Sequence, residues 1–193
     1  MADRDGGRDR DGGRDRRRLD AVRDAAQIRA RADGLRTVER DHPHWGHAHR
    51  EHVRATDEQL ALRAKSGINA RGRPGPTPEH ATRWQSTQAM VIAEDGLRNS
   101  AEFQRKQRDA ASAPGKARQI TVRRPLAEVL GPRWRGDVYG RSHASGGAQP
   151  SRWRPDSTAV AIWRLQDDGQ WHLYTCYPEP RPYGSVRRKV NGQ

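Results

Sequence analysis

The stretch "STAVAIWRLQDDGQWHLYTCYP", residues 157–178, carries the strongest secondary-structure pattern in the chain. Two runs rich in β-branched and aromatic residues flank Asp168 and Gly169. Such runs are typical of strands, and an Asp-Gly pair suits the positive φ angles of a tight hairpin turn. The sequence therefore predicts an antiparallel β-hairpin at this point.

The side chains of the second strand should alternate between the two faces of the sheet. One face is predicted to carry Trp171, Leu173, Thr175 and Tyr177, and the opposite face His172, Tyr174 and Cys176. Thr175 and Tyr177 are therefore expected to be neighbours, with His172 pointing away from both. Thr and Tyr are also favoured in strands for ordinary packing reasons, so the pair by itself indicates no function.

Two helical patterns open the central part of the chain. Pro43 suits the start of a short helix over residues 44–54. Thr56, with Gln59 three residues later, resembles a capping box for a second helix, and Gly67 is placed to end it. Two short helices are therefore expected to follow one another directly.

The middle of the chain predicts one more helix and two strands. Residues 81–108 carry apolar side chains at helical spacing, with Gly96 as a break. The segment "QITVR" (residues 119–123) alternates apolar and polar residues, and "GDVYGRS" (residues 136–142) is short and flanked by glycine. Helices first and an antiparallel sheet later predict an α+β domain.

The first residues have a different character. Residues 3–14 read "DRDGGR" twice, with balanced charge and nothing to bury, which predicts a flexible leader. Residues 19–38 have weak helical spacing, interrupted at Gly34, and are expected to form a helical connector. Three parts are therefore predicted: a disordered leader with this connector (residues 1–40), one domain (residues 41–181) and a basic tail (residues 182–193).

Composition narrows the class of partner. Lys and Arg total 37 against 24 Asp and Glu, which gives a net charge of +13 at pH 7. This excess favours a polyanion such as RNA or DNA, although a basic surface that serves solubility gives the same composition. The single cysteine, Cys176, excludes an internal disulfide framework. No apolar stretch follows Met1 that would act as a signal peptide or span a bilayer.

Histidines are concentrated in one short segment. Five of the eight lie between residues 42 and 52, namely His42, His44, His47, His49 and His52. Neutral imidazoles bind zinc, so a metal cage is one interpretation. No cysteine accompanies the cluster, and either helical or extended backbone would aim the rings in several directions. Solvated polar residues are therefore the interpretation for most of the five.

Both ends of the predicted domain resemble one known family. The stretch "GHAHREHVRATDEQLALRAKSGI", the segment "ATRWQSTQAMVIAEDGL" and the closing "WHLYTCYPEP" are similar to the ribonuclease A-like toxin domains at the C-termini of bacterial contact-dependent growth inhibition proteins. The resemblance covers residues 42–180. Its most specific elements are G-H-x4-H-V, an arginine eleven residues beyond the second histidine, and T-x-Y-P on the last strand.

The resemblance implies four active-site residues. The family's histidine falls on His52, its arginine on Arg63, and its strand-borne pair on Thr175 and Tyr177. The two pairs are accordingly expected to share one cleft, although more than a hundred residues separate them. His47 matches the first histidine of the motif, without an assigned role.

The chain departs from the family at two positions outside this set. Arg54 stands where the family has glycine, and Trp84 occupies an aromatic position that is often Phe. The fold implied is ribonuclease A-like, with N-terminal helices packed on an antiparallel sheet and no disulfides.

The four residues suit RNA cleavage, because RNA carries its own nucleophile and needs only proton transfer and positive charge at the phosphate. The resemblance implies a metal-independent endoribonuclease without cofactors, which forms a 2′,3′-cyclic phosphate, with tRNA as a target. It also implies an antibacterial toxin that is secreted or delivered into the cytoplasm of a target bacterium and is bound by an immunity protein. Two alternatives stay open: a non-catalytic RNA- or DNA-binding protein, and a metal-dependent nuclease built on the histidine cluster.

Overall fold

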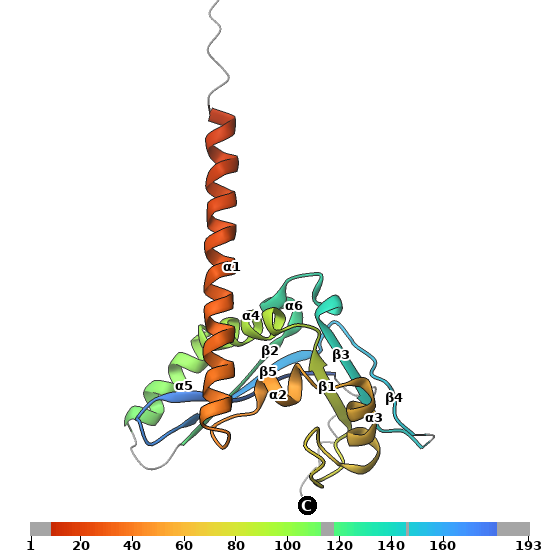
Figure 1. Ribbon diagram of the computed structural model, residues 1–193. Coiled ribbons are helices and arrows are strands. Elements are labelled where there is room, and N and C mark those ends of the chain that lie inside the picture. Colours follow the sequence, from red (N-terminus) through yellow and green to blue (C-terminus); the bar gives the residue numbers. More distant parts are fainter. Residues whose placement is uncertain (1–8, 113–117, 146, 181–193) are drawn as a thin grey trace, which may run out of the picture.

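The computed structural model describes residues 9–112, 118–145 and 147–180, so the predicted basic tail and the first part of the leader lie outside the described residues. The fold is mixed α+β (Figure 1). The helices are α1 (Asp9–Asp41), α2 (Ala48–His52), α3 (Asp57–Ser66), α4 (Thr87–Arg98), α5 (Ala101–Ser112), α6 (Leu126–Leu130) and the short 3-10 helix η1 (Trp134–Asp137). The strands are β1 (His80–Trp84), β2 (Gln119–Pro125), β3 (Val138–Ser142), β4 (Gln149–Pro150), β5 (Thr158–Leu165) and β6 (Trp171–Glu179).

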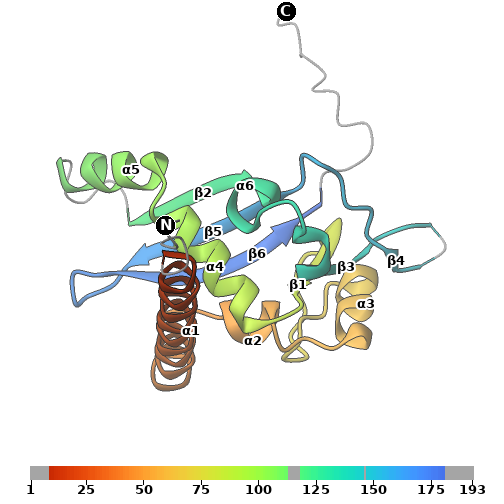
Figure 2. The ribbon, with the colours of Figure 1, turned by 90° about the horizontal axis from the view of Figure 1, so that it is seen from above.

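The described strands form two antiparallel sheets of three strands each. One has the order β1-β3-β4 and the other β2-β5-β6, and α4 crosses the second sheet (Figure 2). Two side chains of β1 link the sheets, because Thr82 Oγ1 donates to the Pro178 carbonyl at 2.5 Å and Trp84 Nε1 to the Cys176 carbonyl at 2.9 Å. These bonds hold β1 against β6.

The predicted hairpin is confirmed as β5 and β6, but its turn differs in detail. The Gln166 N–H donates to the Gln170 carbonyl at 3.0 Å, which closes a three-residue loop. Gly169 has φ +76, and no described residue other than glycine has a positive φ, so Asp168 does not. A three-residue loop with glycine in the left-handed position replaces the tight turn that needs two positive φ angles.

A β-bulge in β6 overturns the predicted alternation of its faces. Thr175 pairs with Ile162 and Leu173 with Trp163, which leaves Tyr174 as an extra residue in the strand. An extra residue reverses the alternation beyond it. Leu173 and Cys176 consequently both enter the core, whereas Tyr174, Thr175 and Tyr177 all line the cleft described below. The alternation that predicted His172 to point away from Thr175 and Tyr177 does not hold across the bulge, but the His172 ring lies against Asp168 and Trp45 and is not among the described residues that line the cleft.

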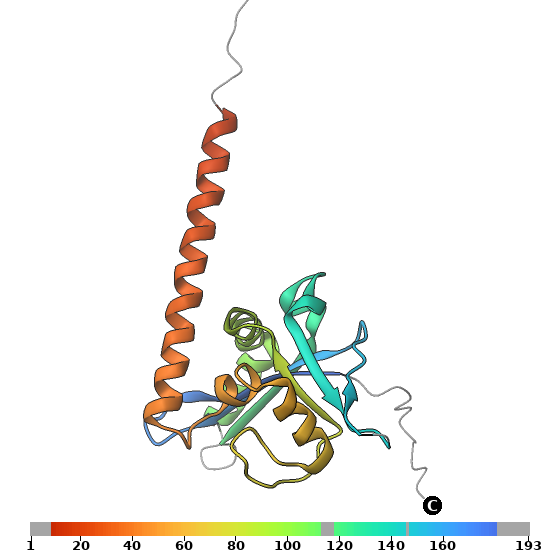
Figure 3. The same cartoon turned by 45° about the vertical axis from the view of Figure 1, so that its right-hand side comes forward.

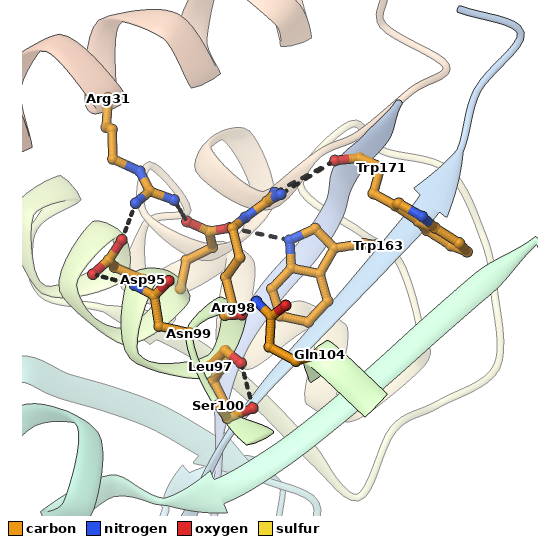
Figure 4. Close-up of polar contacts among 10 residues, drawn as sticks. Arg31, Asp95, Leu97, Arg98, Asn99, Ser100, Gln104, Trp163 and Trp171 are labelled. Atoms are coloured by element: carbon orange, nitrogen blue, oxygen red, sulfur yellow. Dashed lines mark hydrogen bonds and ion pairs between the residues drawn. The ribbon is translucent and has the colours of Figure 1, made fainter. Parts of the chain in front are cut away.

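Tryptophan residues form much of the core, as their concentration in the domain suggests. Trp84, Trp134 and Trp163 are each at most 2% exposed. Glu94 of α4 is also buried, with 1% of its surface exposed. Its carboxylate accepts from Trp163 Nε1 at 3.0 Å, from Arg98 Nε at 2.7 Å and from Arg31. Figure 4 shows Arg31, Arg98 and Trp163 converging at this point, which fastens α1 and β5 to α4.

Helix α1 corrects the prediction for the N-terminal segment. It runs unbroken from Asp9 to Asp41, through the segment expected to be flexible and through Gly34. Gly34 has open space around it, so its cost is only the helix propensity of glycine, about 1 kcal/mol. Ile28, Ala32 and Leu35 pack against the core, whereas the first half of the helix projects from the domain (Figures 1 and 3). The second half of α1, which precedes the predicted boundary at residue 41, therefore packs against the core.

A carboxylate from α1 explains where α2 begins. Residues 43–45 form a turn and α2 starts only at Ala48, not near Pro43 as predicted. The buried Glu39 side chain accepts from the backbone N–H groups of His49 at 2.6 Å and Arg50 at 3.1 Å. These N–H groups of the first helical turn have no partner within the helix, so Glu39 acts as an N-cap supplied by another helix. The capping box of Thr56 and Gln59 on α3, and its end at Gly67, are confirmed.

The helix predicted over residues 81–108 is wrong in its first part. Residues 80–84 form β1, which pairs with β3, and the remainder is two helices, α4 and α5, that meet at Asn99 and Ser100. Gly96 lies inside α4, where a Cβ would stand 3.3 Å from the Val129 side chain. Glycine there permits the close approach of α6 and does not break the helix. None of the described helices is long and apolar enough to cross a bilayer.

Candidate active-site cleft

A cleft of about 820 Å³ lies between the two sheets, under α2 and α3. All four predicted active-site residues line it: His52 from α2, Arg63 from α3, and Thr175 and Tyr177 from β6. The expectation that these pairs share one cleft is confirmed. The remaining lining residues are His47, Glu51, Ala55, Gln59, Leu60, Ala70, Pro78, Glu79, His80, Ala81, Thr82, Tyr174, Pro178, Glu179 and Pro180.

His52 is held in one orientation by β1. Its Nδ1 lies 3.1 Å from the Thr82 carbonyl oxygen, and its ring centroid lies 5.2 Å from that of Tyr177. A carbonyl only accepts hydrogen bonds, so Nδ1 carries the proton and Nε2 is left as an acceptor. Burial lowers the pKa of His52 to about 4, assisted by the charge of Arg63 and opposed by the Thr82 bond. His52 is therefore neutral at pH 7, with Nε2 as the ring nitrogen that can accept a hydrogen bond or a proton.

His47 is a second imidazole in the cleft, placed by close backbone contact with β6. Its N–H donates to the Tyr174 carbonyl at 2.9 Å, and a Cβ on Gly46 would come within 2.4 Å of the Leu173 carbonyl oxygen. Only glycine fits there. The His47 ring lies 5.9 Å from the His52 ring and edge-on to Tyr174. Burial lowers the pKa of His47 to about 3, helped by nearby positive groups, of which His52 is the largest contributor.

These two histidines predict a loss of stability in mild acid. In the unfolded chain a histidine takes up its proton near pH 6.5, whereas folded His47 and His52 resist it down to about 3 and about 4. Their stabilising contribution is therefore complete above pH 6.5 and is lost as the pH falls toward those values. The free energy of unfolding should drop by up to about 1.4 kcal/mol per pH unit for each histidine. The raised pKa of Glu51 acts in the opposite direction, because this carboxyl takes up its proton at a higher pH in the folded chain than in the unfolded chain.

The measurement is urea unfolding at intervals from pH 7 to pH 5. His47→Gln should flatten the pH dependence, because it removes one of the buried histidines whose pKa is lowered. His42→Gln, at an exposed histidine of the same segment, is the matched control and should keep the wild-type slope. A His47→Gln profile as steep as that of the wild type would contradict the assignment.

Glu51 is a cleft residue that the sequence did not single out. Its Oε2 lies 3.8 Å from an Nη of Arg63 and its Oε1 lies 3.5 Å from Arg71 Nε, with 11% of the side chain exposed. Burial raises the pKa of Glu51, opposed by the charges of Arg63 and Arg50. The carboxylate thus sets two guanidinium groups side by side at the mouth of the cleft. No local pattern marks this role, because Arg71 belongs to a loop that reaches α2 only in the fold.

Thr175 has an unused hydrogen-bonding group. It is 5% exposed, and its Oγ1 has no partner among the described residues. A buried hydroxyl without a partner costs about 1–3 kcal/mol, so native proteins rarely keep one without a reason. Tyr177 lies two residues further along the same face. Burial raises the pKa of Tyr177 above its ordinary value of 10, with a smaller contribution from Glu179, so its hydroxyl stays a hydrogen-bond donor.

The cleft has charged side chains of both signs. Arg63 lines it together with Glu51, Glu79 and Glu179. His80 also lines it, with Nδ1 2.8 Å from Ser142 Oγ. Burial lowers the pKa of His80, and Glu79 and Glu179 oppose that shift. A bound phosphate would be drawn to Arg63 and away from the glutamates.

The histidine cluster disperses in the fold. His42 stacks on Trp45 with ring centroids 4.0 Å apart, and buried His49 contacts Thr87 Oγ1 at 3.2 Å on the side of α4. Of the five, His47 and His52 line the cleft that also holds Arg63, Thr175 and Tyr177. Within residues 9–112, 118–145 and 147–180, no three or more His, Cys, Asp or Glu side chains gather in a way that could hold a metal ion.

The chain was compared with protein-family models, with curated proteins and with solved structures. The chain matches no family model, no curated protein and no solved structure.

Proposed function

We propose that the chain is a ribonuclease A-like endoribonuclease that cleaves RNA without a metal. The observation that carries the proposal is the convergence of His52, Arg63, Thr175 and Tyr177 in one cleft, from elements more than a hundred residues apart. Two features of the cleft add support: the neutral, oriented imidazole of His52 and the buried, unused hydroxyl of Thr175.

The reaction uses the RNA 2′-hydroxyl as nucleophile. His52 Nε2 accepts the 2′-OH proton as the 2′-oxygen attacks phosphorus, and the bond from phosphorus to the 5′-oxygen breaks to leave a 2′,3′-cyclic phosphate. Arg63 binds the phosphate oxygens and stabilises the charge of the pentacoordinate transition state. The Thr175 hydroxyl donates to a phosphate oxygen. The proton that His52 accepted balances the reaction when it passes to the departing 5′-oxygen, directly or through water.

The biological setting rests on the family resemblance. In this proposal the chain is an antibacterial toxin delivered into the cytoplasm of a target bacterium, and tRNA is its target. An immunity protein would block such an enzyme by covering the cleft. The net charge of +13 agrees with a polyanionic substrate, since arginine and lysine neutralise backbone phosphates.

Incubation of the purified protein with total RNA, with and without chelator, tests the proposal. Cleavage that is unaffected by chelator and leaves 2′,3′-cyclic phosphate ends is the expected result. The same RNA with 2′-O-methyl groups should be resistant, because its nucleophile is blocked. Binding without cleavage would favour a non-catalytic RNA-binding protein, and cleavage that chelator abolishes would favour a metal-dependent nuclease.

Thr175→Val separates function from folding in the same assay. Valine has nearly the shape of threonine, and the hydroxyl it removes makes no hydrogen bond among the described residues. Stability should therefore be unchanged or slightly higher, whereas the cleavage rate should fall by about tenfold or more, the cost of a lost hydrogen bond to a charged group. A Thr175→Val protein that cleaves RNA at the wild-type rate would remove Thr175 from the site.

A further inference from the structure

Two smaller clefts continue from the one that contains His52. The second, of about 360 Å³, shares His47, Glu51, Arg63 and Tyr174 with the first. The third, of about 340 Å³, shares His44 with the second. The second cleft therefore adjoins the first, and His44 lies between the second and the third.

The second cleft is built on an ordered loop that presents two arginines. The loop between α3 and β1 folds on the Asn69 side chain, whose Oδ1 accepts from the N–H groups of Arg71 and Arg73 at 3.0 Å each. At its base, Gly67 has φ +76, and a Cβ there would meet the Gly75 carbonyl at 2.1 Å. These contacts hold the backbone of Arg71 and Arg73 beside Arg63, and all three line the second cleft.

The third cleft adds two more guanidinium groups. Arg164 lies 3.4 Å over the ring of Tyr174, whose side chain lines the first two clefts. Among the described residues, Arg118 has Asp167 as its one ion-pair partner, at 3.3 Å and with both side chains largely exposed, so a phosphate can replace this partner at little cost. Of the described residues that line these two clefts, none in the third carries a carboxylate, and in the second Glu51 alone does, which is engaged by two arginines.

We propose that the second and third clefts bind the phosphates that flank the scissile bond of a polynucleotide. The inference rests on the proposed function, because it takes the first cleft as the place of cleavage. Arg71 and Arg73 hold the phosphate next to the reacting one, and Arg118 and Arg164 hold phosphates further along the strand. Shared lining residues keep one strand continuous from His52 to Arg118.

Binding of 2′-O-methyl oligonucleotides of two and ten nucleotides tests this phosphate track, which is the second and third clefts with their four arginines. These oligonucleotides resist cleavage by 2′-hydroxyl attack. Arg73→Ala/Arg118→Ala removes one arginine from each of the two clefts and leaves the lining of the first unchanged. Arg105→Ala/Arg133→Ala is the matched control, since it removes the same charge from exposed positions outside all three linings. Affinity is measured by fluorescence anisotropy over a range of salt concentrations.

The Arg73→Ala/Arg118→Ala protein should bind the ten-nucleotide strand on the order of tenfold more weakly than the control at 0.1 M salt. Its slope of log affinity against log salt should be shallower by about 1.4, since each single-strand phosphate contact contributes about 0.7. The loss should shrink for the two-nucleotide strand, whose single phosphate occupies the first cleft. Equal losses at both lengths, or a variant that binds like the control, would overturn the track.

The outcomes distinguish this inference from the proposed function. The wild-type protein could bind the ten-nucleotide strand with the predicted dependence on length and salt, yet cleave no RNA. That result would support the phosphate subsites and contradict the proposed ribonuclease activity. RNA cleavage by the wild type, together with binding of the Arg73→Ala/Arg118→Ala protein at the control's affinity, would support the ribonuclease activity and contradict the phosphate subsites.

Discussion

His52→Ala should lower the rate of RNA cleavage on the order of 10² to 10⁴-fold, the range for loss of a general acid-base group. The reason is geometric, since the Thr82 carbonyl fixes Nδ1 as donor and leaves Nε2 as the proton acceptor in the cleft. The measurement is cleavage of a labelled RNA by folded variants, in chelator, from pH 5 to pH 9. Because the pKa of His52 is lowered to about 4, wild-type kcat/KM should not fall between pH 7 and pH 5 through protonation of this group.

His42→Ala is the matched control for this variant. It removes an exposed histidine from the same segment, and His42 does not line the cleft that holds His52. Its cleavage rate should stay within a factor of two or so of the wild-type rate. His47→Ala reports whether the second imidazole takes part, because its ring lies 5.9 Å from that of His52. Full activity in His52→Ala would end the proposal, whatever the family resemblance implies.

Glu94→Ala should destabilise the domain by about 3–5 kcal/mol, the range for breaking a buried ion pair by removing one partner. The carboxylate is 1% exposed and serves Trp163, Arg98 and Arg31 together. Its loss leaves the Trp163 N–H without its acceptor and removes the carboxylate that pairs with Arg98. Urea unfolding at pH 7 measures the change, with the midpoint and the slope reported separately.

Two further variants interpret that result. Glu102→Ala removes a carboxylate from a surface i,i+4 pair with Lys106 and should cost less than about 1 kcal/mol. Glu94→Gln keeps an acceptor for Trp163 and loses the charge, so it should fall between the two. A Glu94→Ala protein as stable as Glu102→Ala would show that this cluster does not fasten α1 and β5 to α4.

Local signals in the sequence predicted local structure well. The hairpin of β5 and β6 and the capping box of α3 depend on residues that are neighbours in the chain, and both are confirmed. The start of α2 was missed because its cap comes from Glu39 on another helix. The β1 strand was taken for helix because its partner β3 lies more than fifty residues away, and helical spacing over a short apolar run does not exclude a strand.

The candidate site divides in the same way. A motif with fixed spacing gave His52 and Arg63, and a second motif gave Thr175 and Tyr177, so their meeting in one cleft was predictable from the resemblance. Glu51 was not, because its ion pairs join α2 to a loop and a helix that only the fold brings near. The bulge at Tyr174 was not either, since a single extra residue leaves no mark on a pattern of alternating apolar and polar residues.

The projecting half of α1 makes the domain easy to hold without obstructing it. From Asp9 to about Gln27 the helix stands clear of the sheets, on the side away from α3 (Figures 1 and 3). At 1.5 Å per residue this is a rod of about 28 Å. A dye, a bead or a surface joined at that end would keep its distance from His52, and large folded RNAs would still have free access to the clefts. The projecting half of α1 thus serves as a rigid spacer for immobilised or single-molecule experiments.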